Sequence, residues 1–289
     1  MRQPVVLDLD DSVGPLAGRL VLPLREWEEG IRFGCSLRRL HRFCGTLAGV
    51  LPRDHGTVFL GSGDFHHLTL PLVQRVPGAW RFQVVVIDNH PDNMRFPFGV
   101  HCGSWVRRVA ALPRVSHVHV VGITSGDIGS RHAWENYLAP LRAGKLTYWS
   151  AGVDVSWAAR FGFGAAFRSF TDTDAMADAF VDAQQAQREP VYLSIDKDAY
   201  APDVATTNWD QGTLSEASGA AIVGAVRGRL IGSDITGEIS SYRYKTWWKR
   251  RLSAMDGQVE ADRYRLAEWQ AQQHALNLRL LGLIEGNRR

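Results

Sequence analysis

Short apolar runs recur along the chain and predict buried strands. Two of them, residues 82–87 and 191–193, are each followed at once by acidic residues. Uninterrupted apolar runs of this length are typical of strands that are buried on both faces of a parallel sheet. Six further runs have the same character: residues 5–7, 57–59, 118–121, 146–149, 165–167 and 230–232.

Helical patterns lie between these runs. Residues 37–50 and 173–188 carry apolar residues three and four apart, and the second follows a capping Asp172. This alternation predicts an α/β fold: a three-layer α/β/α sandwich with a mostly parallel sheet of about eight strands. No linker divides the chain, so we expect a single domain over residues 1–289, with a C-terminal helical segment at about 256–283. Its expected packing face is Leu266, Trp269, Leu276 and Leu280.

The acidic residues that follow the first two runs have the spacing of a metal site. Asp88, His90 and Asp92 follow one run, and Asp196 and Asp198 follow the other. Side chains two apart on an extended segment point to the same side, and parallel strands end at one edge of the sheet. Four carboxylates in one pocket would repel one another unless cations were bound. Two divalent ions would balance their charge.

A third segment brings imidazoles to the same edge. The stretch Gly63-Asp64-Phe65-His66-His67 comes soon after the run at 57–59. With His90, it gives a ligand set that is rich in oxygen, has two nitrogens and lacks sulfur. Such a set favours Mn²⁺ over Zn²⁺, although other divalent ions remain open.

At this point the chain resembles the ureohydrolases, a family that includes arginase, agmatinase and formimidoylglutamase. The family carries Gly-Gly-Asp-His-Ser, Asp-Ala-His-x-Asp, Ser-x-Asp-x-Asp-x-x-Asp-Pro and Asp-x-x-Glu segments in that order. The resemblance covers about residues 57–240. It rests on four stretches in the same order: residues 63–66, 88–92, 194–198 and 234–238.

The resemblance implies an arginase-like fold and a ligand set for two Mn²⁺ ions. Asp88 and Asp196 would bridge the ions, and His66 and His90 would each bind one. The remaining carboxylate ligands would be Asp92 and Asp198.

The resemblance also implies the reaction, which is hydrolysis of a C–N bond in a small guanidino or amidino compound. The products would be urea or a related compound and an amine. Glu238 would hold the cationic group, Asp198 would help to stabilise the tetrahedral intermediate, and His101, in a segment similar to the family's His-Gly segment, would protonate the departing amine. Candidate contacts for the far end of the substrate are Asn93, Arg95 and Asp127.

Three departures from the family pattern leave other interpretations open. Phe65 is inserted before His66, so either His66 or His67 takes the ligand position. Ala201 stands where the family has aspartate, and Gly237 displaces Glu238 by one residue. The paired histidines suggest, as an alternative, a deacetylase-like amidohydrolase with one Zn²⁺. The changes at Phe65 and Ala201 suggest another, a catalytically degenerate binding protein on the same scaffold.

Composition narrows the class of protein further. The net charge of +3 over 289 residues gives no case for nucleic acid, and no stretch has the length and hydrophobicity of a membrane span. Three cysteines without metal-type spacing, and acidic residues near the N-terminus, suggest a cytoplasmic protein. A basic aromatic stretch, residues 242–251, is expected to pack its rings at a helix or subunit interface with its cationic groups in solvent, so a homo-oligomer is compatible with the sequence.

Overall fold

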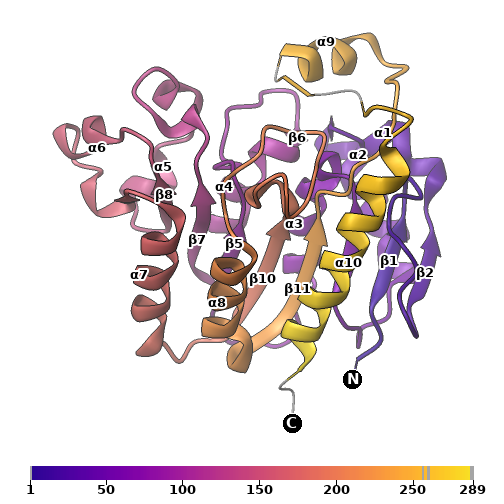
Figure 1. Ribbon diagram of the computed structural model, residues 1–289, viewed down its shortest axis with the longest axis horizontal. Coiled ribbons are helices and arrows are strands. Elements are labelled where there is room, and N and C mark those ends of the chain that lie inside the picture. The colour runs from indigo at the N-terminus through magenta and orange to yellow at the C-terminus, as the bar shows by residue number, and fades with distance from the viewer. Residues whose placement is uncertain (1, 256, 259–260, 287–289) are drawn as a thin grey trace.

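A nine-stranded parallel sheet forms the centre of the molecule (Figure 1). The computed structural model describes residues 2–255, 257–258 and 261–286. The strand order is β2-β1-β4-β11-β10-β5-β7-β8-β9, and every neighbouring pair is parallel. The strands are β1 (Val5–Asp8), β2 (Leu20–Pro23), β4 (Val58–Gly61), β5 (Phe82–Ile87), β7 (Val115–Ile123), β8 (Leu146–Ala151), β9 (Phe167–Phe170), β10 (Val191–Asp196) and β11 (Leu230–Thr236). Two short segments, β3 (Gly34–Cys35) and β6 (Val100–His101), pair antiparallel outside this sheet.

Helices cover both faces of the sheet, so the predicted three-layer α/β/α class is confirmed. Figure 1 shows α7, α8 and α10 side by side on one face. Side chains of α2, α3 and α4 join the apolar core of the other face. The helices are α1 (Glu28–Ile31), α2 (Leu37–Val50), α3 (Thr69–Gln74), α4 (Val106–Ala110), α5 (Ala139–Arg142), α6 (Ser156–Arg160), α7 (Thr173–Gln185), α8 (Glu216–Val226), α9 (Trp247–Met255) and α10 (Leu266–Glu285).

The strands separate two apolar cores. Along β5, Val84 and Val86 belong to one core, whereas Val85 and Ile87 belong to the other. This follows from the two-residue period of a strand, which sends alternate side chains to opposite faces. Each fully buried side chain of this size contributes about 1.5–3 kcal/mol. The uninterrupted apolar runs in the sequence therefore reflect burial on both faces.

The sheet differs from the prediction at its edges. The ninth strand, β2, lies at one edge. Its short apolar run, Leu20–Leu22, was not among the predicted strands, and within it only Leu22 is buried. At the other edge, β9 begins at Phe167 because residues Gly164–Ala166 form a 3-10 turn. Helix α7 begins after Asp172 as expected, since Asp172 accepts a hydrogen bond from the backbone of Ala175, but it ends at Gln185.

The C-terminal region also departs from expectation. The helix begins at Leu266, and position 256, where it was expected to begin, lies outside the described residues. Leu276 and Leu280 are buried as predicted, but Leu266 and Trp269 are half-buried. The helix also buries two polar side chains, Gln273 and Asn277.

The basic aromatic stretch is only partly exposed. Trp247 is exposed as part of α9, but the ammonium group of Lys249 is not in solvent. It donates hydrogen bonds to the backbone carbonyls of Glu29 and Arg32. Lys249 therefore anchors α9 to the end of α1, which corrects the expectation that every cationic group in the stretch reaches solvent. None of the helices that the structure describes is both long and apolar enough to cross a membrane.

The acid sensitivity of the fold should depend on His119 in β7. Its Nδ1 accepts a hydrogen bond from Trp149 at 3.2 Å, and burial lowers its pKa to about 3. As pH falls below about 6.5, His119 therefore binds a proton in the unfolded chain but not in the folded one. The free energy of unfolding then falls by roughly 1.4 kcal/mol per pH unit for this group. His119→Gln should flatten the loss of unfolding free energy between pH 6.5 and 4.5. The exposed control His41→Gln should keep the wild-type slope, and parallel curves for all three proteins would contradict this account.

A candidate metal centre at the carboxyl edge of the sheet

Four adjacent strands bring the acidic segments together in one cleft. The strands β4, β11, β10 and β5 are neighbours in the sheet, and the predicted segments follow their carboxyl ends. The cleft has a volume of about 890 Å³. Asp92, Asp196 and Asp198 line the cleft, and these three residues and the neighbouring Asp88 are at most 5% exposed.

The imidazole of His66 lies among three of these carboxylates. Its Nδ1 is 2.9 Å from Oδ2 of Asp92 and 3.2 Å from Oδ2 of both Asp88 and Asp196. Burial alone would lower the pKa of His66, but the surrounding carboxylates outweigh it and raise the pKa well above its ordinary value. The position therefore attracts a proton or a metal cation.

A hydrogen-bond chain behind His66 sets the orientation of the ring. Ser194 donates its hydroxyl proton to Asp234 at 2.7 Å, and its oxygen lies 3.0 Å from Nε2 of His66. Since the hydroxyl proton is already used, we assign a ring proton to Nε2, which leaves Nδ1 facing the carboxylates. At these distances Nδ1 either carries a second proton or shares a bound cation with the carboxylate oxygens. This is the geometry of a metal-ligating histidine with a supporting second partner.

A second group of potential ligands surrounds His90. Its Nδ1 is 3.0 Å from Oδ2 of Asp198 and 3.7 Å from Oδ1 of Asp88. Two sets of side chains bring ligand atoms within 4.8 Å of one another: His66, Asp88 and Asp196 in one, and Asp88, His90 and Asp198 in the other. Asp88 belongs to both, so two adjacent groups of potential ligands share one carboxylate.

Asp92 is held in a strained conformation at the same site. Its φ of 46° lies in the left-handed region, which is uncommon for residues other than glycine. Trp105 donates its indole N–H to Oδ2 of Asp92 at 2.6 Å. Burial and the neighbouring Asp88 raise the pKa of Asp92 to about 7. This carboxylate is therefore placed where its charge is costly without a cation.

The structure places His66, and not His67, at the carboxylates. The inserted Phe65 is fully buried in the apolar core, within a 3-10 helix that spans Gly63–Leu68. His67 is also buried, and neither ring nitrogen has a hydrogen-bond partner among the side chains described. Burial lowers the pKa of His67 to about 3, so this ring is neutral. The inserted Phe65 therefore packs into the core, and His66 still lies at the carboxylates.

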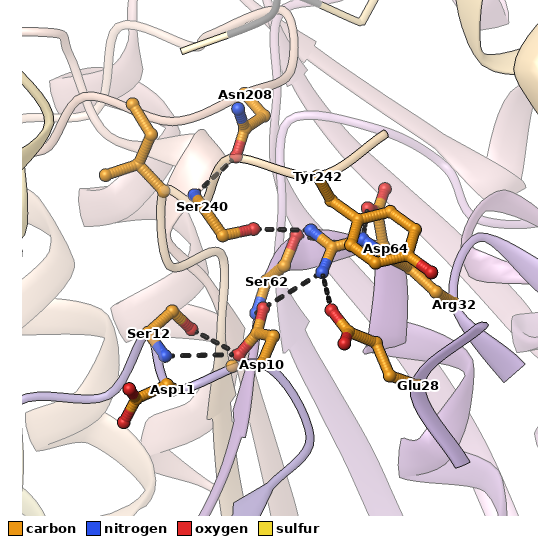
Figure 2. A network of polar contacts seen from close by, with 12 residues as sticks. Asp10, Asp11, Ser12, Glu28, Arg32, Ser62, Asp64, Asn208, Ser240 and Tyr242 are labelled. Carbon is orange, nitrogen blue, oxygen red and sulfur yellow. Dashed lines mark hydrogen bonds and ion pairs between the residues drawn. The ribbon is translucent and has the colours of Figure 1, made fainter. Parts of the chain in front are cut away.

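A buried arginine supports the turn that carries His66 (Figure 2). The guanidinium of Arg32 is 2.7 Å from Asp64, 3.1 Å from Glu28 and 3.3 Å from Asp10, and it also donates to Ser240. These partners come from four separate parts of the chain. Arg32 therefore ties the N-terminal segment and the segment after β11 to the turn beside the site, a role that the sequence did not reveal.

His101 lines the cleft between two aromatic rings. Phe33 stacks on it with ring centroids 5.7 Å apart, and Phe96 meets it edge-on at 4.4 Å. Its Nδ1 accepts the backbone N–H of Gly103 at 2.9 Å. Burial lowers the pKa of His101 to about 3. The neutral ring therefore carries its proton on Nε2 and acts as a hydrogen-bond donor.

Of the three residues expected to contact the far end of the substrate, only one lines the cleft. Asp127 lines the cleft. Asn93 is fully buried and donates to the carbonyl of Tyr137 and the hydroxyl of Tyr148, and the exposed Arg95 donates to the carbonyl of Asn136, so neither residue lines the cleft. The structure therefore does not bring these two side chains to the cleft, and both contact the loop that carries Asn136 and Tyr137.

Glu238 is also absent from the cleft wall. Its carboxylate lies 2.6 Å from the ammonium of Lys197, and both side chains are buried. Glu238, which was expected to receive a cationic substrate group, is thus paired with an internal cation in the structure. The sequence showed Lys197 between two acids but gave no signal of this long-range pair.

The match to a family model covers residues 31–241 and is described as the arginase family. The chain belongs to the arginase family. This confirms the resemblance and extends it towards the N-terminus to include Arg32. The site described above lies within the matched region.

Individual relatives are distant. An uncharacterized protein of Thermotoga maritima is 27% identical over 226 residues, which cover 78% of this chain and 72% of that protein. Among solved structures, a hypothetical agmatinase from Burkholderia thailandensis is 16% identical with a TM-score of 0.50, covering 98% of this chain and 86% of that chain. Proclavaminate amidino hydrolase from Streptomyces clavuligerus is 18% identical with a TM-score of 0.48, covering 94% and 93%. At this level of identity, the agmatinase likeness supports the arginase-like fold.

Position 237, just before Glu238, should accept only glycine. Gly237 has a φ of 86°, and an added Cβ would lie 2.6 Å from the backbone nitrogen of Lys197 and also against Asp196. Gly237→Ala should lower the free energy of unfolding by more than the roughly 1 kcal/mol expected from backbone strain alone. The control is Gly152→Ala, with a φ of 69° and no atom near the added Cβ. Denaturant unfolding measures both, and equal losses would mean that the contact of position 237 with Asp196 and Lys197 is unimportant.

Proposed function

We propose that the protein is a hydrolase with two Mn²⁺ ions that cleaves a C–N bond of a guanidino or amidino compound. The observation that carries the proposal is Asp88, which belongs to two adjacent groups of potential ligands. One ion would be held by His66, Asp88, Asp92 and Asp196, and the other by Asp88, His90, Asp198 and the bridging Asp196. Membership of the arginase family supports this assignment.

The donor set fits Mn²⁺. Carboxylate oxygens dominate it, the two nitrogens come from His66 and His90, and neither group contains a cysteine. Two such ions, when bound, would lower the pKa of a shared water and polarise the carbon under attack. Nδ1 of His66, which faces three carboxylates, is placed to bind one of these ions in place of a proton.

The residues of the chain would bind and orient the substrate around that carbon. Asp198, which lines the cleft, accepts hydrogen bonds from the amino groups of the reacting carbon as it becomes tetrahedral. His101 donates a hydrogen bond from its Nε2–H towards the departing nitrogen, because its Nδ1 is already bonded to Gly103. The attacking water supplies the proton that the departing amine takes up. The expected role of His101 in protonating the amine thus becomes that of a neutral hydrogen-bond donor.

The charge of the cleft wall favours a cationic substrate. Beyond the metal centre, Asp127, Glu135 and Asp210 line the cleft, and no lysine or arginine is among the described residues that line it. An anionic substrate would meet repulsion from these carboxylates, whereas an amidinium or amine would be attracted. The test is a screen for urea or amine release from guanidino compounds, with neutral amides in parallel. Turnover of amides alone would remove the proposal.

The shared position of Asp88 predicts an unequal effect of two substitutions. Asp88→Asn should weaken both ion positions and reduce bound Mn²⁺ well below one ion per chain. Asp198→Asn should leave the His66 position intact and retain about one ion. Elemental analysis after dialysis against Mn²⁺ measures this, with Asp127→Asn as the control that keeps both ions. Retention of two ions by the Asp88 variant would show that the centre is misplaced.

His101 should affect the rate and leave the metal unchanged. His101→Asn should lower kcat on the order of 10²-fold while metal content stays at the wild-type level. Since the pKa of His101 is about 3, His101 should cause no inflection near pH 6.5 in the pH–rate profile of the wild type. The profiles of wild type and variant should therefore have the same shape in this range. Steady-state kinetics between pH 5 and 9 provide the measurement. An unaltered kcat would restrict His101 to packing between Phe33 and Phe96.

A further inference from the structure

The carboxylate of Glu238 forms a closed cluster with one residue of the metal-binding turn and one residue of α10. Lys197 Nζ lies 2.6 Å from Oε1 of Glu238 and donates to Oδ1 of Asn277 at 3.1 Å. Asn277 in turn donates its Nδ2 to the same Glu238 oxygen at 2.6 Å. Lys197 and Asn277 are fully buried, and Glu238 is 2% exposed.

Helix α10 also fixes the backbone on both sides of Glu238. Gln273 donates to the carbonyl of Gly237 at 2.8 Å and accepts the N–H of Ile239 at 2.7 Å. The buried polar face of α10, Gln273 and Asn277, therefore binds the whole segment 237–239. The backbone around Glu238 is thus fixed, and its side chain cannot turn towards the cleft without breaking its contacts with Lys197 and Asn277.

We propose that Lys197 is a specificity-determining residue, because it is the internal counter-cation of Glu238 and withdraws this carboxylate from substrate recognition. The proposal rests on the hydrolase function proposed above. The reacting group of the substrate must then find its anionic partners among the carboxylates that line the cleft. Lys197 and Asn277 together keep Glu238 as a structural anion.

The physical reason is the cost of an unpaired buried charge. A substrate cation that took Glu238 would leave the ammonium of Lys197 buried without its partner, and breaking a buried pair in this way is strongly unfavourable. The other oxygen, Oε2, has no hydrogen-bond partner among the described residues, but it is buried and does not reach the cleft. Glu238 therefore has no accessible charge to offer.

The first experiment compares two carboxylates in steady-state kinetics on the best guanidino substrate from the screen. Glu238→Gln keeps the size of the side chain and should leave KM within about twofold of wild type. Asp210→Asn, which alters a carboxylate in the cleft wall, should raise KM. A rise of about tenfold or more in KM for Glu238→Gln, the size expected when a charge-assisted hydrogen bond to substrate is lost, would overturn the proposal.

The second experiment needs no turnover. Lys197→Met and Glu238→Gln should each lower the melting temperature, and the double variant should lose less than the sum of the two. The matched control is the exposed pair Arg279–Glu216, which also joins α10 to a neighbouring element and should show little coupling. If the losses of melting temperature for the Lys197 and Glu238 variants are additive, the two side chains do not interact and the proposal is overturned.

The two experiments separate the possible failures. If no guanidino compound is turned over, the proposed function fails while the melting temperatures still report on the pair. If turnover is found and Glu238→Gln weakens substrate binding, only the present inference fails.

Should Glu238→Gln not fold, the double variant Lys197→Met/Glu238→Leu replaces the ion pair by apolar side chains. Its preference between a guanidino substrate and a neutral amide should equal that of wild type, and a loss of that preference would contradict the proposal.

Discussion

Mutual repulsion of buried carboxylates is the constraint on which this structure depends. Asp88, Asp92, Asp196 and Asp198 lie together at the carboxyl edge of the sheet with almost no exposure to water. Two imidazoles approach them closely, and Asp92 adopts a left-handed backbone conformation to complete the set. Such an arrangement is unfavourable as four free anions, and cations would make it stable. The sheet supplies the geometry, because four neighbouring strands end at the same edge.

The surroundings of the cleft keep these ligand atoms in position. Asp234 and Ser194 orient His66 from behind, and Arg32 fixes the turn from which His66 projects. Lys197 connects the turn after β10 to the C-terminal helix through Glu238. Each support is a buried polar contact between segments far apart in the sequence. The catalytic potential of the cleft thus depends on residues that never reach the substrate.

The sequence predicted the fold class, most strands and the meeting of the acidic segments, because these follow from local periodicity and from the rule that parallel strands share a carboxyl edge. It did not predict β2, a four-residue strand at the edge of the sheet in which only Leu22 is buried. It did not predict the contacts of Glu238, Asn93 and Arg95, because their partners lie 41 to 55 residues away along the chain, and no local pattern identifies such contacts. The choice between His66 and His67 likewise required the three-dimensional course of the inserted Phe65.

The central claim is that two cation positions share Asp88. Crystals grown with Mn²⁺ and measured at the manganese absorption edge test it most directly, because anomalous scattering locates each ion without reference to activity. The account predicts two peaks, one bounded by His66, Asp88 and Asp196 and the other by Asp88, His90 and Asp198. A single peak, or peaks away from these side chains, would contradict it.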